Sequence, residues 1–265
     1  MTQIRVVVHG AAGRVGQVML QSLGQDPELE VVGAVDVKAR GDSIPLPDGT
    51  GSIPYATDLA RLLGRVTADV VVDFSNAEGV VPAARAAANA GVNLVVGTTG
   101  LTPAQVEEIK KLATAHKIGA VVAPNFALGA VLMIHMAKVA AKHFDYAEIF
   151  ELHHEQKADA PSGTALSTAQ AMFASRGKPF KHAPVQKETL AGTRGGTMEG
   201  IAIHSVRMPG LMAHQEVLLG GLGQTMSIRH DTIGRECYVP GVALAIKRVV
   251  GIKGLVYGLD TLLGL

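Results

Sequence analysis

The sequence predicts an α/β fold in which a doubly wound parallel sheet is followed by a second, α+β domain. The first observation is that valine-rich runs alternate with helix-like segments through the first half of the chain, an order typical of parallel sheets. The second is that these runs are almost continuously apolar, as in strands buried on both faces. The third is that the regular alternation of strands and helices ends after residue 125.

The first half supplies five strands and four helices. The expected strands are residues 4–10, 29–36, 69–75, 92–99 and 118–125. The helix-like segments between them are RVGQVMLQSLGQ, TDLARLLGR, AEGVVPAARAAANAG and TPAQVEEIKKLATAHK. Asn76 precedes the third helix, and Thr102 with Pro103 opens the fourth, both standard start signals.

The second half reads differently. A helix at about 128–143 leads into the strand AEIFELHH, a polar loop, and a helix through ALSTAQAMFASRG. Three alternating runs then predict strands of a mixed, largely antiparallel sheet with one face open to solvent: IAIHSVRM, HQEVLLGG and QTMSIRHD. Apolar helical segments around VPGVALAIKRVV and GLDTLLGL close the chain, and we place the domain junction near residues 124–128.

Composition excludes several classes of protein. The chain has 265 residues, 48% of them hydrophobic and 18% charged, which fits a globular protein rather than a disordered one. A net charge of +1 offers no field to recruit nucleic acid or an anionic membrane. The single cysteine, Cys237, excludes an internal disulfide and indicates a reducing cytoplasm. No signal peptide or membrane span is expected, because His9 and Arg14 interrupt the N-terminal apolar run, and His135 and Lys138 interrupt the later one.

A glycine-rich loop, GAAGRVG at residues 10–16, lies between the first strand and the first helix. Glycines there let backbone N–H groups approach a pyrophosphate at the positive end of the helix, as in Rossmann-like dinucleotide-binding domains. The spacing is GxxGxxG rather than GxGxxG, and an ordinary tight turn remains the alternative. Asp36, at the end of the second strand, stands where a carboxylate accepts hydrogen bonds from the adenosine ribose.

The cofactor preference is open at this point. Asp36 favours NAD, because a 2′-phosphate would meet its negative charge, whereas Lys38 could offset that charge and admit NADP. We expect both NADH and NADPH to bind. Two further loops, GTTG at 97–100 and APNFALG at 123–129, follow buried strands at the same edge, so three loops together favour a dinucleotide site.

The stretch ELHHEQKADAPSGTA, residues 151–165, holds the densest group of reactive side chains. His153, His154 and Lys157 precede a helix start at PSGTA, where Ser162 is a candidate cap and the N–H groups of Gly163 and Thr164 are exposed. A helix start beside a lysine and an imidazole is a receptor for a carboxylate or phosphate, and imidazole exchanges protons near neutral pH. Together with a cofactor domain, this predicts a reductase for a small carboxylated substrate.

The sequence leaves four other interpretations open. Residues 151–165 could be a polar loop with no chemical role. The chain could be a hydrolase that uses Ser162 with a histidine base, although no GxSxG elbow is present. A zinc site could draw on residues Glu151, His153, His154 and Asp159, although the spacing is not HExxH. The chain could also be a non-catalytic NAD(P)H sensor, because a dinucleotide fold alone does not fix function.

The motif E-L-H-H-x-x-K-x-D-A-P-S-G-T-A resembles the signature of the 4-hydroxy-tetrahydrodipicolinate (dihydrodipicolinate) reductase family of lysine and diaminopimelate biosynthesis. The loop G-x-x-G-R-x-G, DFS at 73–75, GTTG, A-x-N-F and the pair His230/Arg235 occur in the order that the family shows. The resemblance covers nearly the whole chain.

The resemblance implies a role for each matching position. His153 would be the acid/base and Lys157 a second proton donor, while His154, Gly163 and Thr164 would bind the carboxylates of a small dicarboxylate substrate. The cofactor would contact Gly10, Ala11, Ala12, Gly13, Arg14, Val15, Asp36, Gly97, Thr98, Thr99, Ala123, Pro124, Asn125 and Phe126. Lys38 is added to these cofactor-binding residues because of its charge beside Asp36.

The resemblance also implies the organisation of the chain. Residues 1–124, completed by 235–265, would form the dinucleotide-binding domain, and residues 125–234 would bind substrate and build a homotetramer. Three positions depart from the family pattern: Val15 replaces a common methionine, Val37 stands where some members carry an arginine for the 2′-phosphate, and Pro124 replaces a small residue.

Overall fold

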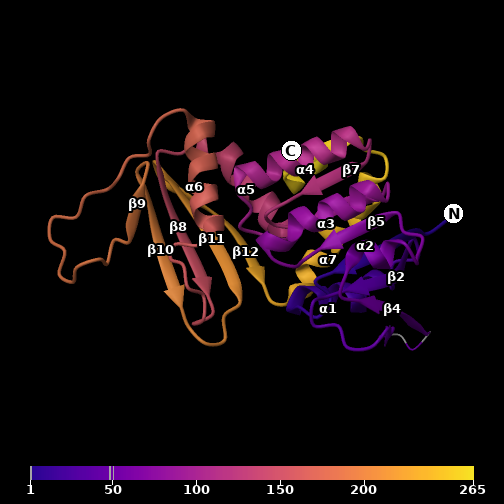
Figure 1. Cartoon of the computed structure of the whole chain (residues 1–265). Coiled ribbons are helices and arrows are strands. Elements are labelled where there is room, and N and C mark those ends of the chain that lie inside the picture. Colours follow the sequence, from indigo (N-terminus) through magenta and orange to yellow (C-terminus); the bar gives the residue numbers. More distant parts are fainter. Residues whose placement is uncertain (1, 48, 50) are drawn as a thin grey trace. The chain divides into compact units, whose positions relative to one another are not determined.

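The structure is a computed structural model that describes residues 2–47, 49 and 51–265. It divides into two compact units, Met1–Leu128 with Arg235–Leu265, and Gly129–Gly234. The predicted α/β class is confirmed, with a largely parallel sheet in the first unit and a mixed sheet in the second (Figure 1). Among the described residues, no helix has the length and apolar character needed to cross a membrane.

The first unit is built on a sheet that, in the described part of the chain, has eight strands in the order β13-β7-β6-β5-β1-β2-β4-β3. Neighbouring strands are parallel except for the antiparallel pair β3/β4 at one edge. The strands are β1 (Ile4–His9), β2 (Leu29–Val35), β3 (Ser43–Pro45), β4 (Ser52–Ala56), β5 (Val70–Asp73), β6 (Asn93–Val96), β7 (Gly119–Val122) and β13 (Gly254–Tyr257). Parallel strands present their carboxyl ends at one edge, which is where ligand loops gather in such sheets.

Helices cover both faces of this sheet. They are α1 (Arg14–Leu23), α2 (Leu59–Leu63), α3 (Ala77–Asn89), α4 (Pro103–Ala115), the 3₁₀ turn η1 (Arg235–Tyr238), α7 (Val239–Val249) and α8 (Leu259–Leu263). Helices α2, α3 and α4 pack side by side on one face, whereas α1 and α7 contact each other on the other side (Figure 1). The predicted caps are confirmed: the Asn76 side chain accepts the N–H of Gly79, and Thr102 forms a capping box with Gln105.

Strands β3, β4 and β13 were not predicted from the sequence. The first two form an antiparallel pair that extends the sheet beyond β2, and β13 joins it beside β7, where Gly254 pairs with Gly119 and Tyr257 with Val122. Each is only three to five residues long, too short to carry a periodic signal of its own. Pairing stabilises them: β3 pairs with β4, β4 with β2, and β13 with the more distant β7.

The second unit is built on a sheet of order β12-β11-β8-β10-β9. Its elements are α5 (Leu128–Ala141), β8 (Tyr146–His153), α6 (Gly163–Arg176), β9 (Gly196–Met198), β10 (Ile201–Arg207), β11 (Ala213–Gly221) and β12 (Gln224–Thr232). Strand β10 runs parallel to β8, and the other pairs are antiparallel, so the predicted mixed sheet is confirmed.

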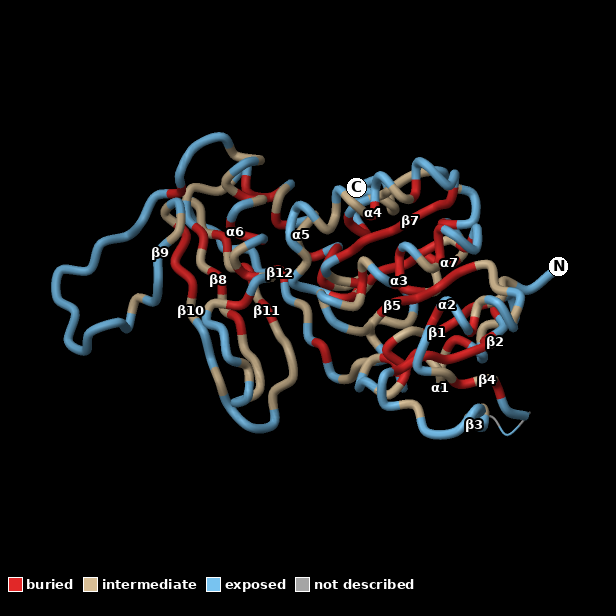
Figure 2. Tube along the Cα trace, viewed as in Figure 1, coloured by how far each residue is buried: buried red, intermediate tan, exposed pale blue. Residues whose placement is uncertain are grey.

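One face of this second sheet is packed against helices α5 and α6. Ala147 and Ile149 of β8 join Met133 of α5 and Met172 of α6 in one hydrophobic core. Figure 2 shows buried stretches along β8. Because side chains alternate along a strand, Glu151 lies on the same inward face as Ile149, and it is fully buried. The sheet therefore places a carboxylate under the last residue of β8, His153.

Candidate active site

The glycine loop connects β1 to the start of α1, and Asp36 holds it in place. The Asp36 carboxylate accepts the N–H of Ala12 through Oδ2 and the N–H of Lys38 through Oδ1, both at 2.9 Å. Gly13 caps α1 without a side-chain hydrogen bond, so the positive end of the helix carries no acceptor from its own cap. Asp36 is thus placed beside the loop that the sequence assigned to the pyrophosphate.

Phe74, directly after β5, explains why glycine stands at two positions of this edge. Gly10 has a positive φ of 82°, and a Cβ on it would lie 2.5 Å from the carbonyl oxygen of Phe74. A Cβ on Gly97 would collide with the Phe74 ring itself. The same ring packs edge-on against Phe126, with centroids 6.2 Å apart. Phe74 therefore joins the three predicted ligand loops within this unit.

Asp73 forms a second buried polar cluster at the same edge, one that the sequence analysis did not identify. It is fully buried and receives His9 Nδ1 at 2.5 Å and the Thr98 hydroxyl at 2.5 Å. The backbone N–H and hydroxyl of Ser75 also donate to Asp73, at 3.0 to 3.2 Å. The hydroxyl of Thr98, one of the residues predicted to contact the cofactor, is thus bonded to a carboxylate of the protein.

The other cofactor residues predicted from sequence lie in the loops after these strands or, for Arg14 and Val15, in the first turn of α1. Arg14 and Lys38 are exposed, as are Thr99 and Pro124, whereas Ala123 is buried. The Asn125 side chain accepts the N–H of Ala127 at 2.9 Å and shapes the turn after β7.

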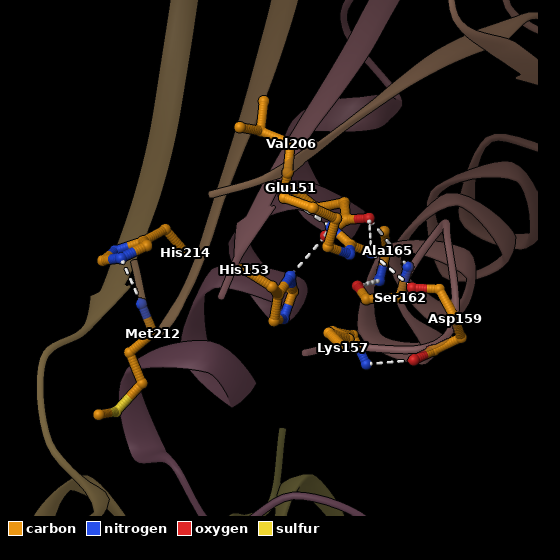
Figure 3. Close-up of polar contacts among 10 residues, drawn as sticks. Glu151, His153, Lys157, Asp159, Ser162, Ala165, Val206, Met212 and His214 are labelled. Atoms are coloured by element: carbon orange, nitrogen blue, oxygen red, sulfur yellow. Dashed lines mark hydrogen bonds and ion pairs between the residues drawn. The ribbon is translucent and has the colours of Figure 1, made fainter. Parts of the chain in front are cut away.

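In the second unit, His153 and Glu151 form a close pair. His153 Nδ1 lies 2.5 Å from Glu151 Oε2, and the His153 side chain is only 14% exposed (Figure 3). Arg207, on the neighbouring strand β10, reaches both carboxylate oxygens, with Nη1 2.9 Å from Oε2 and Nη2 2.8 Å from Oε1. The N–H of Ser162 also donates to Oε1, at 3.2 Å. One carboxylate therefore contacts a strand end, a neighbouring strand and a helix start.

These contacts shift the pKa values of both partners. Burial tends to raise the pKa of Glu151, but hydrogen bonds from Arg207 and His153 outweigh it and leave this pKa below its ordinary value. Burial also lowers the pKa of His153, against the opposing effect of the Glu151 carboxylate, and the nearby charges of Lys157 and Arg207 lower it further. Glu151 is accordingly ionised near neutral pH, while His153 is mainly neutral there.

A turn brings Lys157 back toward the end of β8. The N–H of Lys157 donates to the carbonyl of His154 at 3.2 Å, and the Lys157 ammonium pairs with Asp159 at 2.6 Å. Figure 3 shows the His153 ring and the Lys157 side chain on the same side of Glu151. The structure thus brings together the two groups that the sequence proposed as proton donors.

The start of α6 completes the group. The Ser162 hydroxyl accepts the N–H of Ala165 at 3.2 Å, which confirms Ser162 as the predicted cap. Gly163 is exposed and Thr164 half-buried, in the first turn, where backbone N–H groups have no intrahelical acceptor. Ser162 itself is buried and serves as a cap, which does not favour the hydrolase interpretation.

The zinc interpretation finds no support in the described part of the chain, where no three or more His, Cys, Asp or Glu side chains are grouped to hold a metal. Glu151 is bonded to Arg207 instead, and Asp159 to Lys157.

Comparison with known proteins agrees with this arrangement. The chain matches the dihydrodipicolinate reductase N-terminal family over residues 4–126 and the C-terminal family over residues 129–263. It belongs to the dihydrodipicolinate reductase family. The 4-hydroxy-tetrahydrodipicolinate reductase of Dehalococcoides mccartyi strain BAV1 is 53% identical over 100% of both chains, and that of Moorella thermoacetica is 49% identical over 98% of both.

A solved structure extends the likeness to three dimensions. The dipicolinate-bound dihydrodipicolinate reductase from Paenisporosarcina sp. TG-14 has a TM-score of 0.88 and 40% identity, and the match covers 98% of this chain and 99% of that one. Membership of this family makes the chain an enzyme and a reductase, so the resemblance inferred from the sequence is confirmed.

The Asp73 cluster yields a prediction about stability. Thr98→Val removes a donor from a buried carboxylate while keeping the side-chain shape, and should lower the free energy of unfolding by about 1–3 kcal/mol. Thr98→Ser should restore most of the loss, and the exposed neighbour Thr99→Val should change stability by no more than about 0.5 kcal/mol. Denaturant unfolding of the three variants measures this, and a Thr98→Val protein as stable as wild type would contradict the account.

Proposed function

We propose that the chain reduces 4-hydroxy-tetrahydrodipicolinate with NADH or NADPH, the reduction step that its family supplies to lysine and diaminopimelate biosynthesis. The observation that carries the proposal is that His153 and the α6 start both contact Glu151, with Lys157 beside His153, in a chain of this family. Loss of water and addition of hydride saturate a ring carbon, and the neighbouring centre must then gain a proton.

The first unit fits a nicotinamide dinucleotide. Helix α1 begins without a side-chain cap, after a glycine loop that Asp36 holds, and such a start receives a pyrophosphate. When bound, the dinucleotide supplies the hydride. Asp36 accepts the ribose hydroxyls, and Lys38 is near enough in sequence to compensate for a 2′-phosphate, so both NADH and NADPH bind. The loops at 97–99 and 123–126 line the nicotinamide.

The second unit supplies the proton and holds the substrate. His153 Nδ1 is engaged by Glu151, so Nε2 is the ring nitrogen that transfers the proton, with Lys157 assisting. The N–H groups of Gly163 and Thr164, together with His154, bind the carboxylates of the substrate. A dicarboxylate is bound in the related structure from Paenisporosarcina, which supports this substrate class.

A homotetramer built through the second unit is part of the proposal. The sheet face opposite α5 and α6 carries a stack of Phe150 on His204, with ring centroids 4.6 Å apart, and ion pairs from Glu148 to Arg194 and His204. Tyr146 on β8 and Val206 on β10 are partly exposed there. A face of aromatic, apolar and paired charged groups suits association with further copies of the chain.

The cofactor assignment predicts that substitutions at Asp36 and Lys38 change the affinities for NADH and NADPH by different amounts. Asp36→Ala should weaken NADH binding by about tenfold or more and NADPH binding less, because it removes the ribose acceptor and also the charge that opposes a 2′-phosphate. Asp36→Asn is a second variant that removes the charge and keeps one acceptor oxygen, at the cost of one of the two backbone hydrogen bonds that Asp36 accepts. Lys38→Ala should weaken NADPH selectively. Fluorescence titration measures these affinities, and equal losses for both nucleotides in both alanine variants would show that the adenosine pocket lies elsewhere.

The proton-transfer assignment predicts a split between kcat and KM. His153→Ala and Lys157→Ala should lower kcat by about 10²–10⁴-fold and leave NADH affinity intact, because each removes a positioned proton donor. His154→Ala should chiefly raise KM, the mark of lost ground-state binding.

Steady-state kinetics with the product of dihydrodipicolinate synthase, in parallel with NADH titration, measures the split. The exposed residue Glu155 lies in the same turn, and Glu155→Ala serves as the control with unchanged kinetics. If His154→Ala loses turnover while His153→Ala keeps it, the two roles are reversed.

A further inference from the structure

We propose that Glu151 and Arg207 are positioning residues, a buried charge pair that orients His153 for proton transfer. This inference rests on the proposed function, because it gives His153 its role as proton donor. Neither Glu151 nor Arg207 is needed to touch the substrate; both act through the histidine ring.

The geometry around Glu151 leaves the ring little freedom. The carboxylate is fully buried and lies on the same face of β8 as His153, two residues away. It accepts Nδ1 at 2.5 Å, which places the proton of the neutral ring on Nδ1 and leaves Nε2 free of this contact. A carboxylate that orients a catalytic imidazole in this way fixes both its tautomer and its direction.

Arg207 keeps Glu151 ionised and in place. It spans both carboxylate oxygens, and its Nη2 also donates to the carbonyl of Asp159 at 2.6 Å. Arg207 pairs with His153 in the register of β10 and β8, so the guanidinium enters from the strand beside the ring. A bidentate arginine with a buried carboxylate is among the strongest pairings available to a protein.

The same carboxylate also fixes the anion receptor. The N–H of Ser162 donates to Glu151 Oε1, and Ser162 caps α6. The proton donor at the end of β8 and the first turn of α6 are therefore positioned by one group. A displacement of Glu151 would move both.

Among the described residues, the charged groups that shift the pKa of His153 are Glu151, Lys157 and Arg207, and they act in opposite directions. Burial has the largest effect and lowers the pKa of the imidazole. Glu151, on the same strand, raises this pKa, while Lys157 in the following turn and Arg207 on β10 lower it. If the pair only ties β8 to β10, changing either residue would lower the stability of the protein. If the pair also tunes His153, changing Glu151 and changing Arg207 must shift the pKa of His153 in opposite directions.

The test is direct titration of His153 in the full-length protein by NMR of ¹³C,¹⁵N-labelled histidine, with His153→Gln used for assignment. Glu151→Gln removes the negative charge, so the pKa of His153 should fall. Arg207→Met removes the positive charge, so the pKa should rise, and Arg207→Lys, which keeps the charge, should give a smaller change. The double variant Glu151→Gln/Arg207→Met removes both charges, avoids an isolated buried ion, and should give an intermediate pKa.

The pH dependence of kcat should shift in the same direction as the pKa of His153. A proton donor works while protonated, so the decline of kcat with rising pH should move to lower pH in Glu151→Gln and to higher pH in Arg207→Met. At neutral pH, kcat of Glu151→Gln should fall by about tenfold or more, but less than that of His153→Ala. In the wild type, the ¹⁵N shifts should place the neutral-ring proton on Nδ1.

Shifts of the same sign in the two single variants, or no shift in either, would overturn the inference. The double variant serves if a single variant does not fold. The account requires the His153 pKa of the double variant to lie below that of Arg207→Met and above that of Glu151→Gln, so the opposite order relative to whichever single variant folds would contradict it. Failure of the proposed function is a separate outcome: His153→Ala would retain turnover, whatever the NMR titration shows.

Discussion

The buried carboxylate of Glu151 is the constraint on which the reactive group of this protein depends. Burying a carboxylate is unfavourable unless charged and hydrogen-bonding partners surround it, and here Arg207, His153 and the N–H of Ser162 meet that need. Each partner belongs to a different segment, so satisfying one charge fixes the end of β8, the end of β10 and the start of α6 together. The chemistry of the loop at 151–165 follows from that arrangement.

The first unit uses the same device at the edge of its parallel sheet. Asp73 is buried at the end of β5 and gathers His9 from β1, Ser75 from its own loop and Thr98 from the loop after β6. Phe74 beside it requires glycine at positions 10 and 97. In each unit, then, a buried acid ties together loops that the sequence presents as separate motifs, and the backbone of these loops is left to receive ligands.

The sequence predicted the features that depend on local pattern. Valine runs predicted the parallel strands, and the helix starts were predicted from Asn76, Thr102 and Ser162. The stretch at 151–165 identified the reactive residues and the family. The sequence did not reveal the partners, because these depend on tertiary pairing: Arg207 meets Glu151 only through the register of β10 with β8, and Asp73 meets Thr98 only through that of β5 with β6. One signal was available, since Glu151 and His153 are two residues apart on a predicted strand and must share a face.

A crystal structure of the protein with NADH and pyridine-2,6-dicarboxylate tests the central claim most directly, because this planar dicarboxylate resembles the substrate and accepts no hydride. The account predicts a carboxylate of the ligand on the N–H groups of Gly163 and Thr164, with His153 Nε2 turned toward the ligand ring and Nδ1 still on Glu151. A dicarboxylate bound away from the start of α6, or a His153 ring that has left Glu151 in the complex, would contradict it.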